Sequence, residues 1–172
     1  LESPVLLNHE LSTLKNHLSQ FTTEIDCTYD INSKTDFLNE IQRICAEAEQ
    51  AVRSGSQHLI ITDKNISKDR IALPMILATS AVHSHLVKNN LRTFTSLNVS
   101  SLECLDVHYF AVLIGVGATT VNASLIENIV SDRLNKNIYQ NISYSTLLKN
   151  YKKAIEKGLR KIISKMGISI IS

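Results

Sequence analysis

The sequence is poor in the residues that interrupt regular structure, and it has no stretch that could cross a membrane. It contains no tryptophan, two prolines and five glycines in 172 residues. No apolar run approaches the roughly 20 residues that a bilayer span requires. The first ten residues lack the basic start and apolar core of a signal peptide. A net charge of +2 gives no indication of a nucleic-acid partner. We therefore expect a globular domain that binds neither membrane nor nucleic acid.

Cysteine is also scarce. Cys27, Cys45 and Cys104 form an odd set with no CxxC spacing. This pattern argues against a disulfide framework and against a zinc or iron–sulfur site. We expect all three side chains to be buried, and we predict no metal site. The sequence also begins without an initiator methionine, as expected for a piece of a longer polypeptide.

Alternating strand and helix patterns predict an α/β fold. The stretch from Ala51 to Val87 reads as the end of a helix, a turn at Ser54-Gly55, a buried strand at His58–Thr62, a polar loop and a second helix. A strand with a helix on each side indicates a parallel sheet. Four strands are predicted in all, at Phe21–Thr28, His58–Thr62, Leu91–Val99 and Ala118–Asn122.

The predicted helices follow the apolar periodicity. They cover a short segment after Asn8, Thr35–Arg53, Leu73–Asn90, Leu102–Gly115 with a capping signature at Ser100-Ser101, Ala123–Leu134 and Thr146–Lys165. Around Leu102–Gly117, the run FAVLIGVGA could instead be a strand leading into a glycine loop, but its apolar spacing favours the helix. Leu1–Leu7 is expected to be extended, and Ile168–Ile171 is β-like. The sequence thus predicts a roughly four-stranded, mainly parallel sheet of βα units, like an incomplete barrel, followed by a long C-terminal linking helix.

The sequence offers few candidate catalytic or ligand-binding residues. Asp63 and Arg70 lie after a predicted parallel strand, where open α/β folds bind ligands, although a solvated loop is the more frequent explanation. His83 and His85 are two residues apart on a helix, so they point to nearly opposite faces and are expected to be core or interface side chains. His108 is expected to be a buried, hydrogen-bonded imidazole. No catalytic residue is predicted.

Two further patterns have simple structural explanations. Gly115-x-Gly117 lacks the third glycine of a dinucleotide-binding loop, since position 120 is Thr120, and a helix end followed by a tight turn is preferred. The lysine-rich face of the last helix has little aromatic interleaving, so a solvated or domain-facing surface is preferred over RNA or membrane binding.

Several motifs, in order along nearly the whole chain, resemble one family. They are SPVL near the start, AVRSGSQHLIITDKNISKDRIALPMILATSAVHSHLV with LRTFTSLNV, DVHYFAVLIGVGATTVN, and the tail KNYKKAIEKGLRKIISKMGIS. Together they are similar to the central domain of the glutamate synthase large subunit and its link into the FMN-binding synthase domain. One departure is Asn122-Ala123-Ser124-Leu125, where the family usually has NPYL or CPYL.

The resemblance implies a connector within an enzyme that makes L-glutamate from L-glutamine and 2-oxoglutarate. Residues 1–134 would form the central domain, and residues 135–172 would form the linker, helix and start of the FMN domain. Its neighbours in the same polypeptide would be the glutaminase domain and the FMN and 3Fe-4S synthase domain, joined by an ammonia tunnel. The isolated chain is then expected to be inactive and to hold no cofactor.

The resemblance also implies the surroundings of this domain. Met166, Gly167 and Ser169 match the start of the first FMN-domain strand, so they would lie near the flavin in the whole enzyme. The short loop NISKDR favours an NADPH-type enzyme with an FAD- and 4Fe-4S-containing small subunit in a bacterial cytoplasm. A ferredoxin-dependent enzyme of the plastid stroma is the alternative. Other functions left open are a freestanding α/β ligand-binding module and a fragment of another (β/α)-barrel enzyme.

Overall fold

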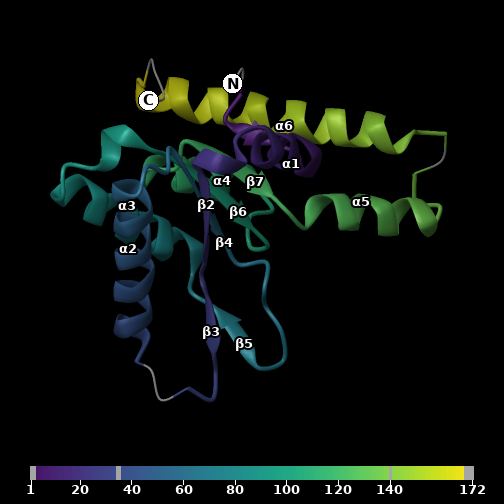
Figure 1. The fold of residues 1–172 in the computed structure, drawn as a ribbon. Helices are drawn as coiled ribbons and strands as arrows, with labels where there is room; N and C mark the ends of the chain where they lie inside the picture. Colours follow the sequence, from purple (N-terminus) through teal and green to yellow (C-terminus); the bar gives the residue numbers. More distant parts are fainter. Residues whose placement is uncertain (1–2, 34–35, 140, 169–172) are drawn as a thin grey trace.

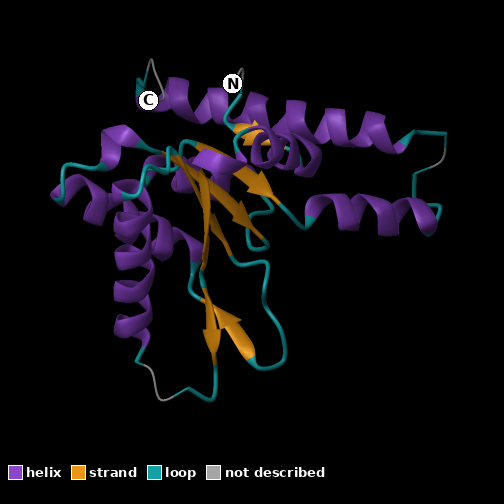
Figure 2. Ribbon diagram, viewed as in Figure 1, coloured by secondary structure: helices purple, strands orange, loops and turns teal. Residues whose placement is uncertain are grey.

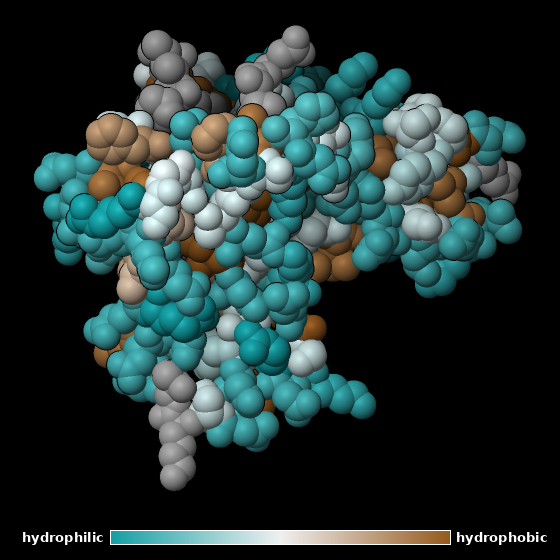
Figure 3. Space-filling model, viewed as in Figure 1, coloured by the Kyte–Doolittle hydropathy of each residue, from teal (hydrophilic) through white to brown (hydrophobic). Residues whose placement is uncertain are grey.

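The computed structural model describes residues 3–33, 36–139 and 141–168. Helices alternate with strands around a five-stranded sheet, and a separate two-stranded sheet extends from it (Figures 1 and 2). The face of the molecule seen in Figure 3 is largely hydrophilic. The strands are β1 (Val5–Leu6), β2 (Thr22–Asp26), β3 (Thr28–Asp30), β4 (His58–Thr62), β5 (Arg70–Ala72), β6 (Ser96–Ser101) and β7 (Thr120–Ala123). The helices are α1 (Asn8–His17), α2 (Phe37–Arg53), α3 (Met75–Lys88), α4 (Val107–Gly115), α5 (Ile126–Asn135) and α6 (Tyr144–Met166).

The main sheet is parallel throughout, with the strand order β1-β7-β6-β4-β2. From β2 through β4 and β6 to β7, each strand pairs with the next one of the sheet along the chain. This order confirms the predicted α/β class and its succession of βα units. The structure adds a fifth strand, because β1 pairs with β7 in the register Val5↔Val121. The sequence indicated only an extended segment there.

Chain direction determines which face of the sheet each helix covers. Connections between parallel strands are right-handed, so successive steps in one direction put their helices on the same face. Consistent with this rule, the main core joins Leu59 and Ile61 of β4 to apolar side chains of α2, α3 and α4. The step from β1 to β2 runs the opposite way. Its helix α1 accordingly packs Leu11 against Ile60 on the other face.

The face that α1 shares carries buried polar side chains. Thr120 donates to Asn98 Oδ1 at 2.7 Å, and Ser100 donates to Asn122 Oδ1 at 2.9 Å. The two amides complete their bonds by donating to backbone carbonyls, Asn98 to Leu59 and Asn122 to Leu6. These cross-strand bonds satisfy groups that would be costly to bury alone. They also link β1, β7, β6 and β4.

The polar loop predicted after β4 contains a strand. β5 pairs antiparallel with β3 in the register Thr28↔Ala72, and this small two-stranded sheet projects from the main sheet alongside α2 (Figure 1). The predicted strand Phe21–Thr28 is divided accordingly: β2 belongs to the main sheet, whereas β3 belongs to the two-stranded sheet. Three residues of β5 are too few for a period-of-two pattern, so the sequence does not reveal the pairing.

The predicted third strand, Leu91–Val99, begins too early. Asn90 has a positive φ of 58° at the end of α3, and a 3-10 turn follows at Arg92–Phe94. The strand is shifted to Ser96–Ser101, so Ser100 and Ser101 lie in β6 and do not cap a helix. The true cap of α4 is Asp106, whose side chain accepts from Tyr109 N at 2.8 Å. Helix α4 therefore begins at Val107, five residues later than predicted.

Helix α6 lies along the outside of the fold beside α5 (Figure 1). Its Ile155 and Leu159 join the main core, and Leu148 packs with Leu7 and Val130. The helix crosses α4 at Gly158, where an added Cβ would lie 2.6 Å from a methyl group of Val107. A glycine inside a helix costs about 1 kcal/mol relative to alanine, so this close approach explains its presence. No described helix is long and apolar enough to span a membrane.

Replacing Gly158 tests this crossing. We expect Gly158→Ala to lower the free energy of unfolding by about 1–3 kcal/mol, because the overlap with Val107 outweighs the gain in helix propensity. Urea titrations followed by circular dichroism measure the change. In a Gly158→Ala/Val107→Ala double variant, removal of the Val107 methyl groups should recover much of the loss. An increase in stability for Gly158→Ala alone would contradict the described packing.

An ion pair between α1 and α6 makes stability depend on pH. Glu10 accepts from Leu7 N at 2.7 Å and from Lys152 Nζ at 2.6 Å. Burial alone would raise the pKa of Glu10, but the hydrogen bonds from Leu7 and Lys152 and the lysine charge outweigh it and lower the pKa. Because the folded pKa lies below the unfolded one, this stabilisation is present near neutral pH and is lost as pH falls through the folded value.

We therefore expect Lys152→Met to reduce stability at pH 7 by about 0.2–1 kcal/mol, since the pair is partly solvated. At a pH below the folded pKa of Glu10, the difference from the unmodified chain should vanish. The matched control is Lys136→Met, which removes an exposed pair with Asp132 and should change little. Equal urea midpoints for Lys152→Met and the unmodified chain at pH 7 would refute the assigned role.

Candidate functional site

The carboxyl edge of the sheet is the first place to look for a site, since ligands of open parallel sheets bind there. Asp63 directly follows β4 at this edge, and its exposure is 0%. Its Oδ1 accepts from Leu102 N at 2.9 Å, and its Oδ2 accepts from Ser101 Oγ at 3.2 Å. Burial raises the pKa of Asp63, and these donors offset only part of that effect. The carboxylate fastens the end of β4 to the segment after β6 and offers no ligand a free oxygen.

Arg70 has an equally structural role. Its Nη2 donates to Asp26 Oδ2 at 3.1 Å and to Thr28 O at 2.9 Å, and its Nε donates to Thr28 Oγ1 at 2.9 Å. The burial of Asp26 would raise its pKa, but hydrogen bonds from Asn65 and Thr28 and the charge of Arg70 lower it overall. Arg70 thus holds the two-stranded sheet to the end of β2. Asp63 and Arg70 do not converge on a common ligand.

The histidines are not brought together. His85 Nε2 lies 2.6 Å from Glu49 Oε2 and joins α3 to α2, whereas His83 accepts from Arg92 Nε at 3.1 Å. Both are interface side chains, as predicted. The prediction for His108 is wrong, because this side chain is exposed. Helix α4 buries Phe110 and Leu113, and that choice of face turns His108 outward.

The described segments give no support for a metal site or for a reactive cysteine. No group of three or more His, Cys, Asp or Glu side chains in residues 3–33, 36–139 and 141–168 is arranged to hold a metal ion. The three cysteines are free and buried, as predicted. Burial raises the pKa of Cys27 to about 12, so its thiol stays protonated and unreactive near neutral pH.

The Gly115-x-Gly117 motif has the wrong surroundings for a dinucleotide. Helix α4 precedes it and strand β7 follows it, the reverse of the strand–loop–helix order that binds a pyrophosphate. Gly117 has a φ of +114°, and a Cβ there would lie 2.3 Å from the His83 ring. The glycine is required by the turn and by this close contact, which confirms the predicted helix end followed by a turn.

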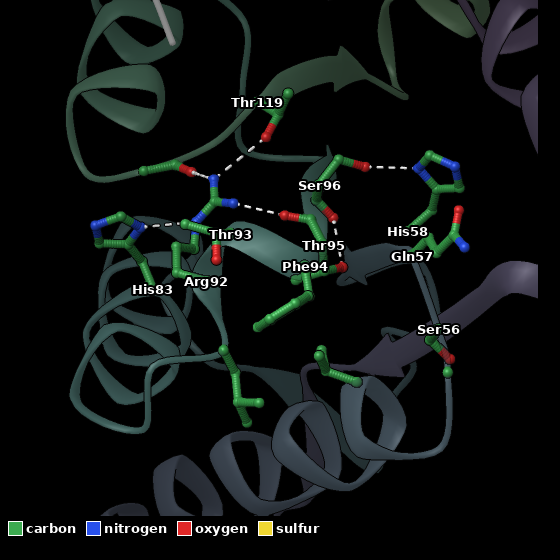
Figure 4. Close-up of a pocket in the computed structure, with 14 residues that line it drawn as sticks. Ser56, Gln57, His58, His83, Arg92, Thr93, Phe94, Thr95, Ser96 and Thr119 are labelled. Atoms are coloured by element: carbon green, nitrogen blue, oxygen red, sulfur yellow. Dashed lines mark hydrogen bonds between the residues drawn. The ribbon is translucent and has the colours of Figure 1, made fainter.

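The opposite, amino-terminal edge of the sheet holds a cavity of about 840 Å³ (Figure 4). Arg92 lies at its side and donates to Thr95 O at 2.6 Å, Gly117 O at 2.9 Å and Thr119 Oγ1 at 3.3 Å, in addition to His83. Burial lowers the pKa of the guanidinium. Arg92 therefore braces the ends of α3 and α4 against β7 with four neutral acceptors, which leaves it little capacity to bind a ligand.

A hydroxyl–imidazole pair lies at the same edge. Ser96 Oγ is 2.7 Å from His58 Nδ1 and accepts from Asn98 Nδ2 at 3.0 Å. A catalytic pair would need a group that orients the second ring nitrogen and donors for an oxyanion. Within the described part of the chain, no such orienting bond to His58 is found. This pair was not predicted from the sequence, because a third strand beginning at Leu91 does not align Ser96 with His58, whereas each is the first residue of its observed strand.

Met166 and Gly167 lie at the end of α6. Met166 is 68% exposed, and Gly167 has a φ of +71° and donates its N–H to Ser164 O. With the N–H of Ile168 bonded to Ile163 O, this is a standard glycine helix end, which explains Gly167 without any ligand. Ser169 and most of the β-like run Ile168–Ile171 lie outside the described residues.

Comparisons with known proteins agree on one family. The family model described as "Glutamate synthase central domain" matches residues 1–172. The large chain of an NADPH glutamate synthase from Azospirillum brasilense is 49% identical over 173 residues, covering 100% of this chain and 11% of that protein. The chloroplastic ferredoxin-dependent glutamate synthase of Spinacia oleracea is 37% identical over 185 residues, with coverages of 100% and 11%.

A third relative is the large chain of an NADPH glutamate synthase from Bacillus subtilis. It is 34% identical over 173 residues, covering 99% of this chain and 11% of that protein. The chain thus spans about a tenth of the length of each of these relatives. Since the family model matches from the first residue to the last, the chain belongs to the glutamate synthase central domain family.

Proposed function

We propose that this chain is the connector of a glutamate synthase, holding the glutaminase and FMN synthase domains of one polypeptide in place around an ammonia path. The whole-length family match carries the proposal. In that polypeptide, residues 1–134 would be the central domain and residues 135–172 the link to the FMN domain. The enzyme would make L-glutamate from L-glutamine and 2-oxoglutarate, and this domain would supply no catalytic residue.

The site geometry supports a connector over a ligand-binding module. Asp63 bonds to Leu102 and Ser101, and Arg70 bonds to Asp26 and Thr28, so both candidate side chains serve structural contacts at the carboxyl edge. At the end of α6, an exposed Met166 and a helix-ending Gly167 form too small a set of donors to hold a flavin. We therefore assign FMN and 3Fe-4S to the following domain. Met166, Gly167 and Ser169 would lie near the flavin only in the whole enzyme.

The alignments favour the NADPH-type enzyme. Against both bacterial NADPH relatives the alignment spans 173 positions for a chain of 172 residues, so it is nearly free of insertions. Against the spinach and rice ferredoxin-dependent enzymes it spans 185 positions, which places extra residues in those proteins. An NADPH-type enzyme would act in a bacterial cytoplasm with a small subunit carrying FAD and 4Fe-4S clusters. A plastid ferredoxin enzyme remains the alternative.

Steady-state assays of the full-length large subunit test the proposal. With its small subunit present, we expect NADPH oxidation that requires both glutamine and 2-oxoglutarate and yields glutamate. Reduced ferredoxin should not replace NADPH. Turnover with ferredoxin but not NADPH would reverse the donor assignment. The absence of any glutamate formation with either donor would contradict the proposed enzyme.

A further inference from the structure

The exposed face of α6 carries a regular line of lysines. Five of them occur at every fourth residue along the helix, and all are exposed, as is a neighbouring arginine. We call this set the lysine stripe; it consists of Lys149, Lys153, Lys157, Lys161 and Lys165, with Arg160 beside them. Lys157, Arg160, Lys161 and Lys165 also surround a shallow hollow of about 530 Å³. No member forms an ion pair within the described residues.

This spacing is unfavourable for an isolated helix. Residues four apart are neighbours on the helix surface, so the stripe contains four successive like-charge pairs, each costing about 0.2–0.5 kcal/mol. Elsewhere the chain places opposite charges at this spacing. Arg43 pairs with Glu47, Arg53 with Glu49 and Lys136 with Asp132, all four residues apart. A merely solvated face would tolerate mixed charges equally well, so the uniform sign calls for an anionic occupant.

The charge is also segregated. Helix α6 holds seven cationic residues and a single acidic one, Glu156. The chain as a whole has 18 cationic and 16 acidic residues, so the remainder has eleven against fifteen. The net charge of +2 therefore conceals a strongly basic helix on an acidic body. Lys152, which pairs with Glu10, is the cation that α6 uses to dock on this body.

The rest of the helix argues against a membrane or nucleic-acid occupant. The apolar face opposite the stripe is packed against the fold through Leu148, Ile155 and Leu159, so this face is not free to enter a bilayer. Tyr151, the aromatic residue within the stripe's span, packs against the core and cannot stack on bases. A carboxylate-rich protein surface is the remaining occupant that matches a line of exposed ammonium groups.

We propose that the lysine stripe docks on an acidic surface of the remaining large-subunit polypeptide. The inference rests on the proposed function. In the relatives, about nine-tenths of the polypeptide lies outside the matched segment, so a tethered partner is present at high effective concentration. Exposed ion pairs contribute only about 0.2–1 kcal/mol each, but several acting together hold a domain that is already tethered.

Zero-length carbodiimide cross-linking of the full-length large subunit, read by mass spectrometry, tests the stripe. We expect Lys157 and Lys161 to be joined to Asp or Glu residues outside these 172. The variant Lys153→Glu/Lys157→Glu/Lys161→Glu should lower the yield of cross-links from Lys149 and Lys165 to the same surface by about tenfold, since a loss of 1.4 kcal/mol or more is expected. The matched control, Lys68→Glu/Lys88→Glu/Lys136→Glu, changes the net charge equally and should leave that yield unaltered.

The outcomes separate the two proposals. A full-length enzyme that forms glutamate but gives no such cross-links overturns the stripe and leaves the proposed function standing. Cross-links from an enzyme that forms no glutamate support the stripe and count against the function. Cross-links found only between two copies of the protein overturn the stripe proposal. So would salt-sensitive binding of anionic vesicles or heparin that the stripe variant abolishes, if it occurred without cross-links.

Discussion

Parallel pairing in chain order is the constraint on which the other features depend. Strands β2, β4, β6 and β7 follow one another across the sheet, so right-handed connections put α2, α3 and α4 on a single face. The sheet residues on that face, and the helix residues that pack on them, must then be apolar. Leu59, Ile61, Leu97, Val99 and Val121 meet these helices there. Each such side chain, once fully buried, contributes about 1.5–3 kcal/mol to the hydrophobic term.

The other face and the edges of the sheet are not covered by α2, α3 and α4, and different residues stabilise them. The remaining strand, β1, is added beside β7, and its helix α1 then covers part of the second face. Buried amides and hydroxyls satisfy one another there, as Asn98 and Thr120 do. At the carboxyl edge, where a ligand would usually bind, Asp63 is bonded to Leu102 and Ser101. The architecture therefore uses its polar groups for rigidity, in agreement with a connector.

Local pattern was enough for the elements that bury a long periodic face. The strand His58–Thr62 was predicted with its observed bounds, and α2 differs from its prediction by two residues at one end. The segments that depend on a distant partner were missed. β1 is two residues long and exists through its pairing with β7, and β5 exists through its pairing with β3. The left-handed conformation of Asn90 displaced the third strand, and no neighbouring glycine signalled it.

At the candidate site, too, local features were predicted and contacts with distant residues were not. The spacing of His83 and His85 correctly indicated side chains that point to different neighbours, and Asp63 was placed at the correct edge of the sheet. Its bond to Leu102 N joins residues 39 positions apart, which no local pattern encodes. The charge of α6 is readable from sequence, but only the packing of Ile155 and Leu159 shows which side is free. The packing of α6 against the fold therefore determines which of its basic side chains face outward.

The most direct test of the connector role is the fate of ammonia in the full-length enzyme. Free ammonia released per glutamine consumed should be compared between the unmodified large subunit and a Gly158→Ala variant, whose contact of α6 with α4 is loosened. We predict unchanged glutamine hydrolysis and a larger fraction of ammonia released to solvent, because the domains are no longer held in their correct relative positions. Loss of hydrolysis in a folded variant, or ammonia release equal to that of the unmodified enzyme, would contradict it.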